Sequence, residues 1–180
     1  MAGDIHKLLA DVGKLSISPS ETIVLVVDDE ASIVSTLERF LRKKGFVVLT
    51  AESAEIALDV LDTDYLPHVV LTDKNLPSLD GLELIRRGKV LAPQTAFVVM
   101  TGYATIESSI EALDLGATGY LQKPFDLNKV VTHVETALAK TMESRRHALL
   151  ADFLRSDVAE LVSTLGDEFR DLDQSIVAIE

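Results

Sequence analysis

Short, largely apolar runs recur along the chain and alternate with segments of helical period. The runs lie at residues 22–28, 46–50, 68–73, 96–101 and 119–122, and each has the length of a strand. Between them, apolar residues repeat every three or four positions, as in helices that bury one face. Because each parallel connection must cross over the sheet, this alternation predicts an α/β domain with a doubly wound, five-stranded parallel sheet.

Helices are expected at residues 31–44, 53–62, 82–87 and 106–115, with a fifth that begins near Asp126. Gly45 and Gly116 follow two of these segments, at positions that suit the end of a helix. Ser53 is placed to serve as an N-cap. Each predicted strand is therefore followed by a predicted helix.

Two segments lie outside the α/β domain, which we place at residues 21–140. Residues 1–20 end in a stretch that contains Ser and Pro, so we expect an N-terminal extension or linker. Residues 141–180 contain no proline and suit a helical extension. From Val158 to Ile179 apolar residues alternate four and three positions apart, which is the pattern of a coiled coil. This seam predicts burial against a second copy, as a homodimer, or against the chain's own α/β domain.

Charge and composition narrow the possible functions. The formal net charge of −12 repels phosphate backbones, so we expect no direct binding to nucleic acid. The chain has no cysteine, which excludes disulfides and thiolate metal sites and fits a reducing compartment. The apolar runs are far shorter than the ~20 residues that a membrane helix needs, and no secretory signal is visible. We therefore expect a soluble, cytoplasmic protein with no membrane association.

Polar side chains follow the predicted strands at the point where each strand ends. Asp28 and Asp29 follow the first strand and Asp73 the third, while Thr101 ends the fourth and Lys123 follows the fifth. The carboxyl ends of parallel strands meet at one edge, where α/β sheets place their ligand sites. One pair of carboxylates ~4 Å apart costs roughly 4 kcal/mol at an effective dielectric of ~20. Such a patch calls for a cation, and Mg²⁺ prefers hard oxygen ligands.

The sequence resembles the receiver domain of bacterial response regulators at four motifs: VVDDE at 26–30, TDKNLPSLDG at 72–81, MTGYA at 100–104 and GYLQKPF at 119–125. The last two are similar to the receivers of NtrC-type regulators. This resemblance implies a flavodoxin-like (βα)5 fold. It also implies a two-component switch that catalyses only its own phosphorylation and dephosphorylation, rather than an enzyme that acts on other substrates.

The resemblance implies that Asp73 accepts a phosphoryl group from the phosphohistidine of a sensor histidine kinase or a phosphotransfer protein. It further implies that Asp28, Asp29 and Asp73 hold Mg²⁺ together with the backbone carbonyl of Asn75. From the residues alone, Asp28 has an alternative role as the N-cap of the helix that begins at Ala31.

The resemblance also assigns roles to residues near the last two strands. Lys123 would contact the phosphoryl oxygens, and Pro124 would follow it through a cis peptide bond. Thr101 would donate its hydroxyl to the phosphoryl group, and Tyr120 would turn inward when Thr101 moves. Two simpler interpretations stay open, namely that Thr101 is an ordinary β-branched strand residue and Tyr120 a static core or edge aromatic.

The output of the switch is the least constrained part of this interpretation. NtrC-type regulators carry an ATPase and a DNA-binding domain, and these 180 residues contain neither. We therefore expect phosphorylation to switch dimerisation or the binding of a downstream protein partner. An alternative is a phosphorelay carrier that passes the phosphoryl group onward. A phosphatase with an aspartyl-phosphate intermediate is disfavoured, because the first acidic motif is DDE and lacks the aspartate spacing of such enzymes.

Overall fold

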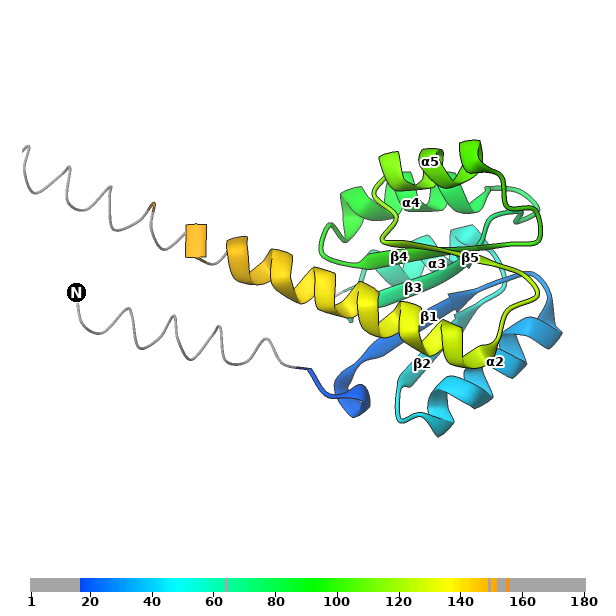
Figure 1. Ribbon diagram of the computed structural model, residues 1–180, viewed down its shortest axis with the longest axis horizontal. Coiled ribbons are helices and arrows are strands. Elements are labelled where there is room, and N and C mark those ends of the chain that lie inside the picture. Colours follow the sequence, from blue (N-terminus) through cyan, green and yellow to red (C-terminus); the bar gives the residue numbers. More distant parts are fainter. Residues whose placement is uncertain (1–16, 64, 149, 152–154, 156–180) are drawn as a thin grey trace, which may run out of the picture. The chain divides into compact units, whose positions relative to one another are not determined.

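A five-stranded parallel sheet organises the part of the chain that the computed structural model describes, residues 17–63, 65–148, 150, 151 and 155. Its strands are β1 (Ile23–Val27), β2 (Val47–Ala51), β3 (Val69–Asp73), β4 (Ala96–Thr101) and β5 (Gly119–Gln122). The helices are α2 (Ala31–Lys43), α3 (Ala54–Leu61), α4 (Gly81–Leu91) and α5 (Ile106–Asp114), with a short 3-10 helix, η1 (Pro19–Glu21), before β1. Residues 127–148 after β5 are also helical. The predicted alternation of strands and helices is confirmed (Figure 1).

The strand order β2-β1-β3-β4-β5 is that of a doubly wound, flavodoxin-like sheet, as predicted. Every neighbouring pair is parallel, so each connection crosses a face of the sheet. The chain moves outward from β1 to β2 and then returns to β3 on the other side of β1. This reversal makes the carboxyl ends of β1 and β3 the switch point, where such sheets bind their ligands.

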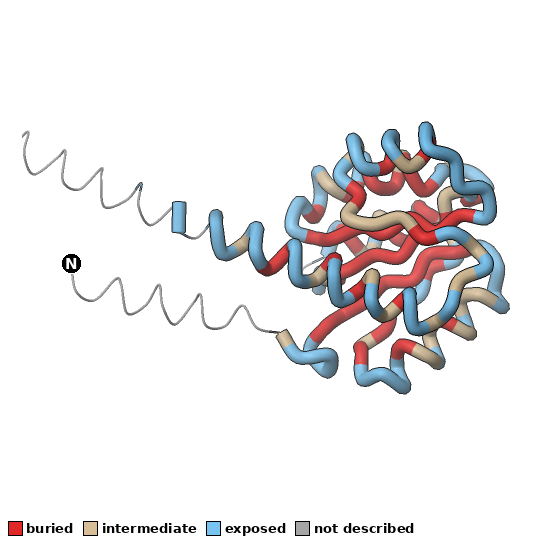
Figure 2. Tube along the Cα trace, in the orientation of Figure 1, coloured by how far each residue is buried: buried red, intermediate tan, exposed pale blue. Residues whose placement is uncertain are grey.

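Each face of the sheet packs against its own group of helices. One core cluster joins the sheet to α3, α4 and α5 and is centred on Phe97. The other joins the opposite face to α2 and to residues 127–138 of the helix after β5, and it contains Met100. Strands β1, β3 and β4 are buried along their whole length (Figure 2). Burial on both faces explains why continuous apolar runs, rather than alternating ones, mark these strands in the sequence.

Capping groups fix the ends of several helices. The Ser53 hydroxyl accepts a hydrogen bond from the Ile56 N–H at 3.3 Å, which confirms the predicted N-cap of α3. Gly45 has a φ of +95° just after α2, a conformation that residues with side chains rarely adopt. The predicted heptad seam from Val158 to Ile179 lies outside the described residues. Ser16–Glu143 form one compact unit, which contains the sheet and its flanking helices.

Helix α4 is longer than the segment at 82–87 that we expected, because it continues through Gly88 to Leu91. Glycine weakens a helix by about 1 kcal/mol relative to alanine. At this position, however, a Cβ atom would lie only 2.6 Å from Cζ of Phe97. Phe97 is completely buried in β4. The missing side chain therefore lets the helix approach the sheet, and packing outweighs helix propensity.

Gly88→Ala is expected to lower the free energy of unfolding by about 1–3 kcal/mol, because the added methyl group would press on the immobile Phe97 ring. Urea denaturation measures this change. Val90→Ala is the matched control, since Val90 lies in the same helix with 81% of its surface exposed. The control should shift the free energy by less than about 0.5 kcal/mol. A Gly88→Ala variant as stable as the wild type would contradict the packing argument.

Candidate functional site

A lysine side chain joins two buried carboxylates at the carboxyl edge of the sheet. Nζ of Lys123 lies 2.7 Å from Oδ2 of Asp28 and 2.6 Å from Oδ1 of Asp73. Asp28 follows β1, Asp73 ends β3 and Lys123 follows β5. The side chains are well shielded, since Asp28 is 1% exposed and Asp73 is 6% exposed. The structure thus brings together three of the residues that the strand ends placed at this edge.

The loop after β3 holds the second oxygen of Asp73. The Asn75 N–H donates a hydrogen bond to Asp73 Oδ2 at 2.6 Å, so each carboxylate oxygen has its own donor. The loop is anchored where the Gly81 N–H donates to the Lys74 carbonyl at 2.9 Å. A Cβ atom on Gly81 would lie 2.1 Å from the Asp73 carbonyl oxygen. Glycine at position 81 therefore permits α4 to begin directly beside the acidic residue.

The surroundings of Asp28 and Lys123 shift the pKa of both groups. Burial raises the pKa of Asp28, and the hydrogen bonds from Lys123 and the Glu30 N–H offset that effect only in part. For Lys123, burial lowers the pKa, but the two carboxylates outweigh it and leave the pKa above its usual value. The ion pair alone would lower the pKa of Asp28, so the nearly complete burial of its carboxylate decides the direction. The alternative role of Asp28 as the N-cap of α2 is wrong, because Glu30 occupies that position.

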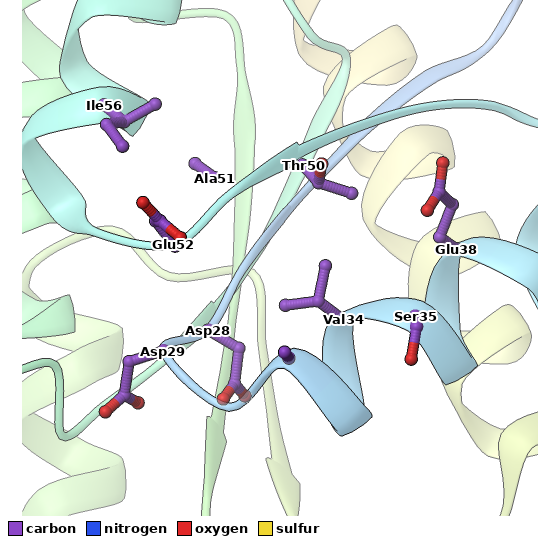
Figure 3. A pocket seen from close by; sticks show the side chains of 10 residues that line it. Asp28, Asp29, Val34, Ser35, Glu38, Thr50, Ala51, Glu52 and Ile56 are labelled. Carbon is purple, nitrogen blue, oxygen red and sulfur yellow. The ribbon is translucent and has the colours of Figure 1, made fainter.

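Asp29 is exposed and lies beside this group rather than within it. Together with Asp28 it lines a hollow of about 340 Å³ between α2 and the loop after β2. Figure 3 shows the two aspartates on the loop after β1, with Glu52 on the loop after β2 and Glu38 on α2. In the described part of the chain, no three His, Cys, Asp or Glu side chains lie close enough together to hold a metal ion. Among the residues that the structure describes, Asp28 and Asp73 are the carboxylates that pair with Lys123.

Thr101 lies next to this group, at the end of β4, and is completely buried. Its hydroxyl accepts a hydrogen bond from the Tyr103 N–H at 3.2 Å. The Lys123 N–H donates to the Thr101 carbonyl at 2.7 Å, so the two backbones are fixed to each other. The Lys123–Pro124 peptide bond is cis, as the resemblance implied.

Tyr120 lies in β5, half-buried against the cluster around Phe97. Its hydroxyl lies 2.8 Å from Oγ of Ser108, in the first turn of α5. Ser108 is not among the site residues predicted from the sequence. The available signal was its spacing from Ala112, four positions later, since both residues are buried on the inner face of α5.

Comparison with known proteins gives this geometry a context. Residues 24–135 match the family described as the response regulator receiver domain. The chain belongs to this family. It is 36% identical over 124 residues to the transcriptional regulator NtrC of Klebsiella pneumoniae, which covers 69% of this chain and 26% of NtrC. It is 29% identical over 155 residues to the transcriptional regulatory protein FixJ of Bradyrhizobium diazoefficiens, which covers 86% of this chain and 73% of FixJ.

Solved receivers have the same fold. A CheY-like receiver domain from Methanospirillum hungatei JF-1 superposes with a TM-score of 0.65 at 27% identity, over 68% of this chain and 98% of that domain. The receiver described here spans about a quarter of the length of the NtrC relatives. Receivers of the NtrC and FixJ type act in two-component signalling with sensor kinases and downstream partners, and they are generally signalling modules rather than enzymes. None of the helices in the described residues is long and apolar enough to cross a membrane.

Asp28→Asn is expected to raise the thermal unfolding midpoint at pH 7 in the presence of EDTA. Because the pKa of Asp28 is raised in the folded state, its ionised form destabilises the fold above that pKa, and this cost disappears as the pH falls through it. The rise in the unfolding midpoint of Asp28→Asn should therefore become smaller towards acid pH. Thermal melts at several pH values measure it. The exposed Asp29→Asn removes the same charge and should give a smaller change. An equal gain in both variants would contradict the burial argument.

Proposed function

We propose that Asp73 accepts a phosphoryl group from the phosphohistidine of a sensor histidine kinase or a phosphotransfer protein. The observation that supports this proposal is the Lys123 ammonium, which lies within 2.7 Å of a carboxylate oxygen of both Asp28 and Asp73. A carboxylate is a weak nucleophile, so its phosphorylation depends on positioning and charge neutralisation rather than on a strong base. The site supplies both in a shielded position.

Each side chain then has a defined part in the transfer. An oxygen of Asp73 bonds to phosphorus as the P–N bond of the phosphohistidine breaks, and the electron pair of that bond returns to the imidazole. The Asn75 N–H keeps the other carboxylate oxygen oriented. The Lys123 ammonium moves to the phosphoryl oxygens, and the Thr101 hydroxyl transfers its hydrogen bond from the Tyr103 carbonyl to the phosphoryl group. The receiver thus promotes only its own phosphorylation and dephosphorylation.

The available donors fit Mg²⁺. Asp28 and Asp73 offer hard carboxylate oxygens on adjacent strands, and Asp29 and the Asn75 carbonyl are the further ligands in this proposal. Mg²⁺ keeps several of its waters and is usually bound through one or two carboxylates plus phosphate oxygens, so this modest donor set is sufficient. When bound, the ion would neutralise charge on the carboxylates and the phosphoryl oxygens.

For the output, we propose that phosphorylation switches dimerisation or the binding of a downstream protein partner. Residues 1–20 would be a linker, 21–140 the receiver, and 141–180 a helical extension that pairs two copies. The excess of acidic residues argues against direct binding to nucleic acid. The absence of cysteine agrees with action in the cytoplasm. The alternative is a phosphorelay carrier, which would pass the phosphoryl group onward without an output of its own.

Asp73→Ala is expected to abolish phosphorylation by acetyl phosphate in the presence of Mg²⁺, because the acceptor oxygen is lost. Intact-mass spectrometry should show one added phosphoryl group on the wild type and none on the variant. EDTA should suppress uptake by the wild type. Asp114→Asn, at the exposed end of α5, changes a carboxylate outside the site and should keep normal uptake. Phosphorylation of Asp73→Ala to the wild-type level would refute Asp73 as the acceptor.

Beryllofluoride, a mimic of the phosphoryl group, separates the two outputs. If phosphorylation drives pairing, light scattering of the full chain with Mg²⁺ should show a rise in molar mass when beryllofluoride is added. The rise should be absent in Asp73→Ala. An unchanged mass together with rapid return of the phosphoryl group to a histidine phosphotransfer protein would instead favour the relay carrier.

A further inference from the structure

Ser108 connects Tyr120 to the first turn of α5. Its Oγ lies 2.8 Å from the Tyr120 hydroxyl, and Ser108 itself is only 6% exposed. The same oxygen takes part in the capping box of α5, where the Thr105 N–H donates to Ser108 Oγ at 3.2 Å. In return, the Ser108 N–H donates to Thr105 Oγ1 at 3.1 Å. One buried hydroxyl therefore serves both the helix cap and the aromatic residue of β5.

The hydrogen-bonding capacity of this hydroxyl is fully used. A serine hydroxyl has one hydrogen to donate and two lone pairs to accept with. Its hydrogen is directed to the Thr105 carbonyl at 3.1 Å, and one lone pair accepts from the Thr105 N–H. The Thr105 hydroxyl donates to the same oxygen at 3.1 Å, and the Tyr120 hydroxyl shares this site at 2.8 Å. If the ring moved away, the hydrogen bond between Ser108 and the half-buried Tyr120 would be lost, which carries a free-energy cost.

The contact between Ser108 and Tyr120 occurs together with a particular orientation of the Thr101 hydroxyl. The Thr101 hydroxyl donates to the Tyr103 carbonyl at 3.4 Å and accepts from the Tyr103 N–H at 3.2 Å, so its hydrogen is not directed toward Asp73. Thr101 and Tyr120 lie on adjacent strands, because Tyr120 pairs with Val99, two residues before Thr101. The Ser108 contact therefore coexists with a Thr101 hydroxyl whose hydrogen is directed to the Tyr103 carbonyl.

We propose that Ser108 is a positioning residue that holds Tyr120 in this resting arrangement and so opposes the phosphorylated one. The inference depends on the proposed function, in which Thr101 and Tyr120 move together on phosphorylation. One buried hydrogen bond between neutral groups changes such an equilibrium by about three- to tenfold. Ser108 would thus set how readily the receiver responds.

The test is the affinity of the full chain for beryllofluoride in the presence of Mg²⁺, measured by isothermal titration calorimetry. Ser108→Ala should bind beryllofluoride about three- to tenfold more tightly than the wild type, because the resting arrangement loses one bond. Tyr120→Phe removes the same bond from the other side without altering α5 and should give a gain of similar size. The double variant should gain no more than either single variant, since both remove one interaction.

Ser109→Ala is the matched control. The Ser109 hydroxyl donates to the same Thr105 carbonyl at 2.9 Å, but Ser109 is only half-buried and its hydroxyl makes no hydrogen bond to Tyr120. This variant should leave the affinity unchanged. A purely structural role for Ser108 in the helix cap would lower the thermal midpoint without tightening beryllofluoride binding.

Three outcomes overturn the inference: unchanged or weaker binding in Ser108→Ala, gains that add in the double variant, or an equal gain in Ser109→Ala. If Ser108→Ala does not fold, Tyr120→Phe alone decides, and the absence of a gain there rejects the proposal. A wild-type chain that does not bind beryllofluoride would instead refute the proposed function, and this inference with it.

Discussion

The burial of two carboxylates beside a single ammonium group is the constraint on which the site depends. Without Lys123, Asp28 and Asp73 would repel each other in a largely buried place, at roughly 4 kcal/mol for a pair ~4 Å apart at an effective dielectric of ~20. Even with Lys123 present, burial keeps the pKa of Asp28 above its usual value. The fold therefore tolerates a destabilising group at its ligand edge, as proteins do where function and stability compete.

The parallel sheet makes this arrangement possible because it collects distant parts of the chain at one edge. Strands β1 and β3 are neighbours, so Asp28 and Asp73 end side by side, while β4 and β5 continue the row with Thr101 and Lys123. Helices on both faces shield the strands from water, but the carboxyl edge stays accessible through loops. The two core clusters stabilise the sheet, and the loops carry the chemistry.

The sequence predicted the strands best where both faces of the strand are buried. Strands β1, β3 and β4 stood out as apolar runs, and the strand-end rule then placed Asp28, Asp73 and Lys123 together, which the structure confirms. Helix α5 shows where periodicity fails. Its large apolar residues, Ile106, Ile110 and Leu113, are 77%, 53% and 55% exposed, while Ser108 and Ala112 face the core. The pattern of large apolar residues would turn α5 the other way, so these residues did not predict the contact between Ser108 and Tyr120.

The free energy that each contact contributes limits how a switch at this site can operate. Moving a two-state element from 1:99 to 99:1 needs about 5.5 kcal/mol of differential stabilisation. A neutral hydrogen bond contributes about 0.5–1.5 kcal/mol and a charge-assisted one about 1.5–3 kcal/mol, so no single exchange of partners is sufficient. Several contacts must change together. The Lys123 N–H holds the Thr101 carbonyl at 2.7 Å, and Tyr120 pairs with β4 through Val99. Because one pair of strands carries all three side chains, their exchanges can be coupled through a single element.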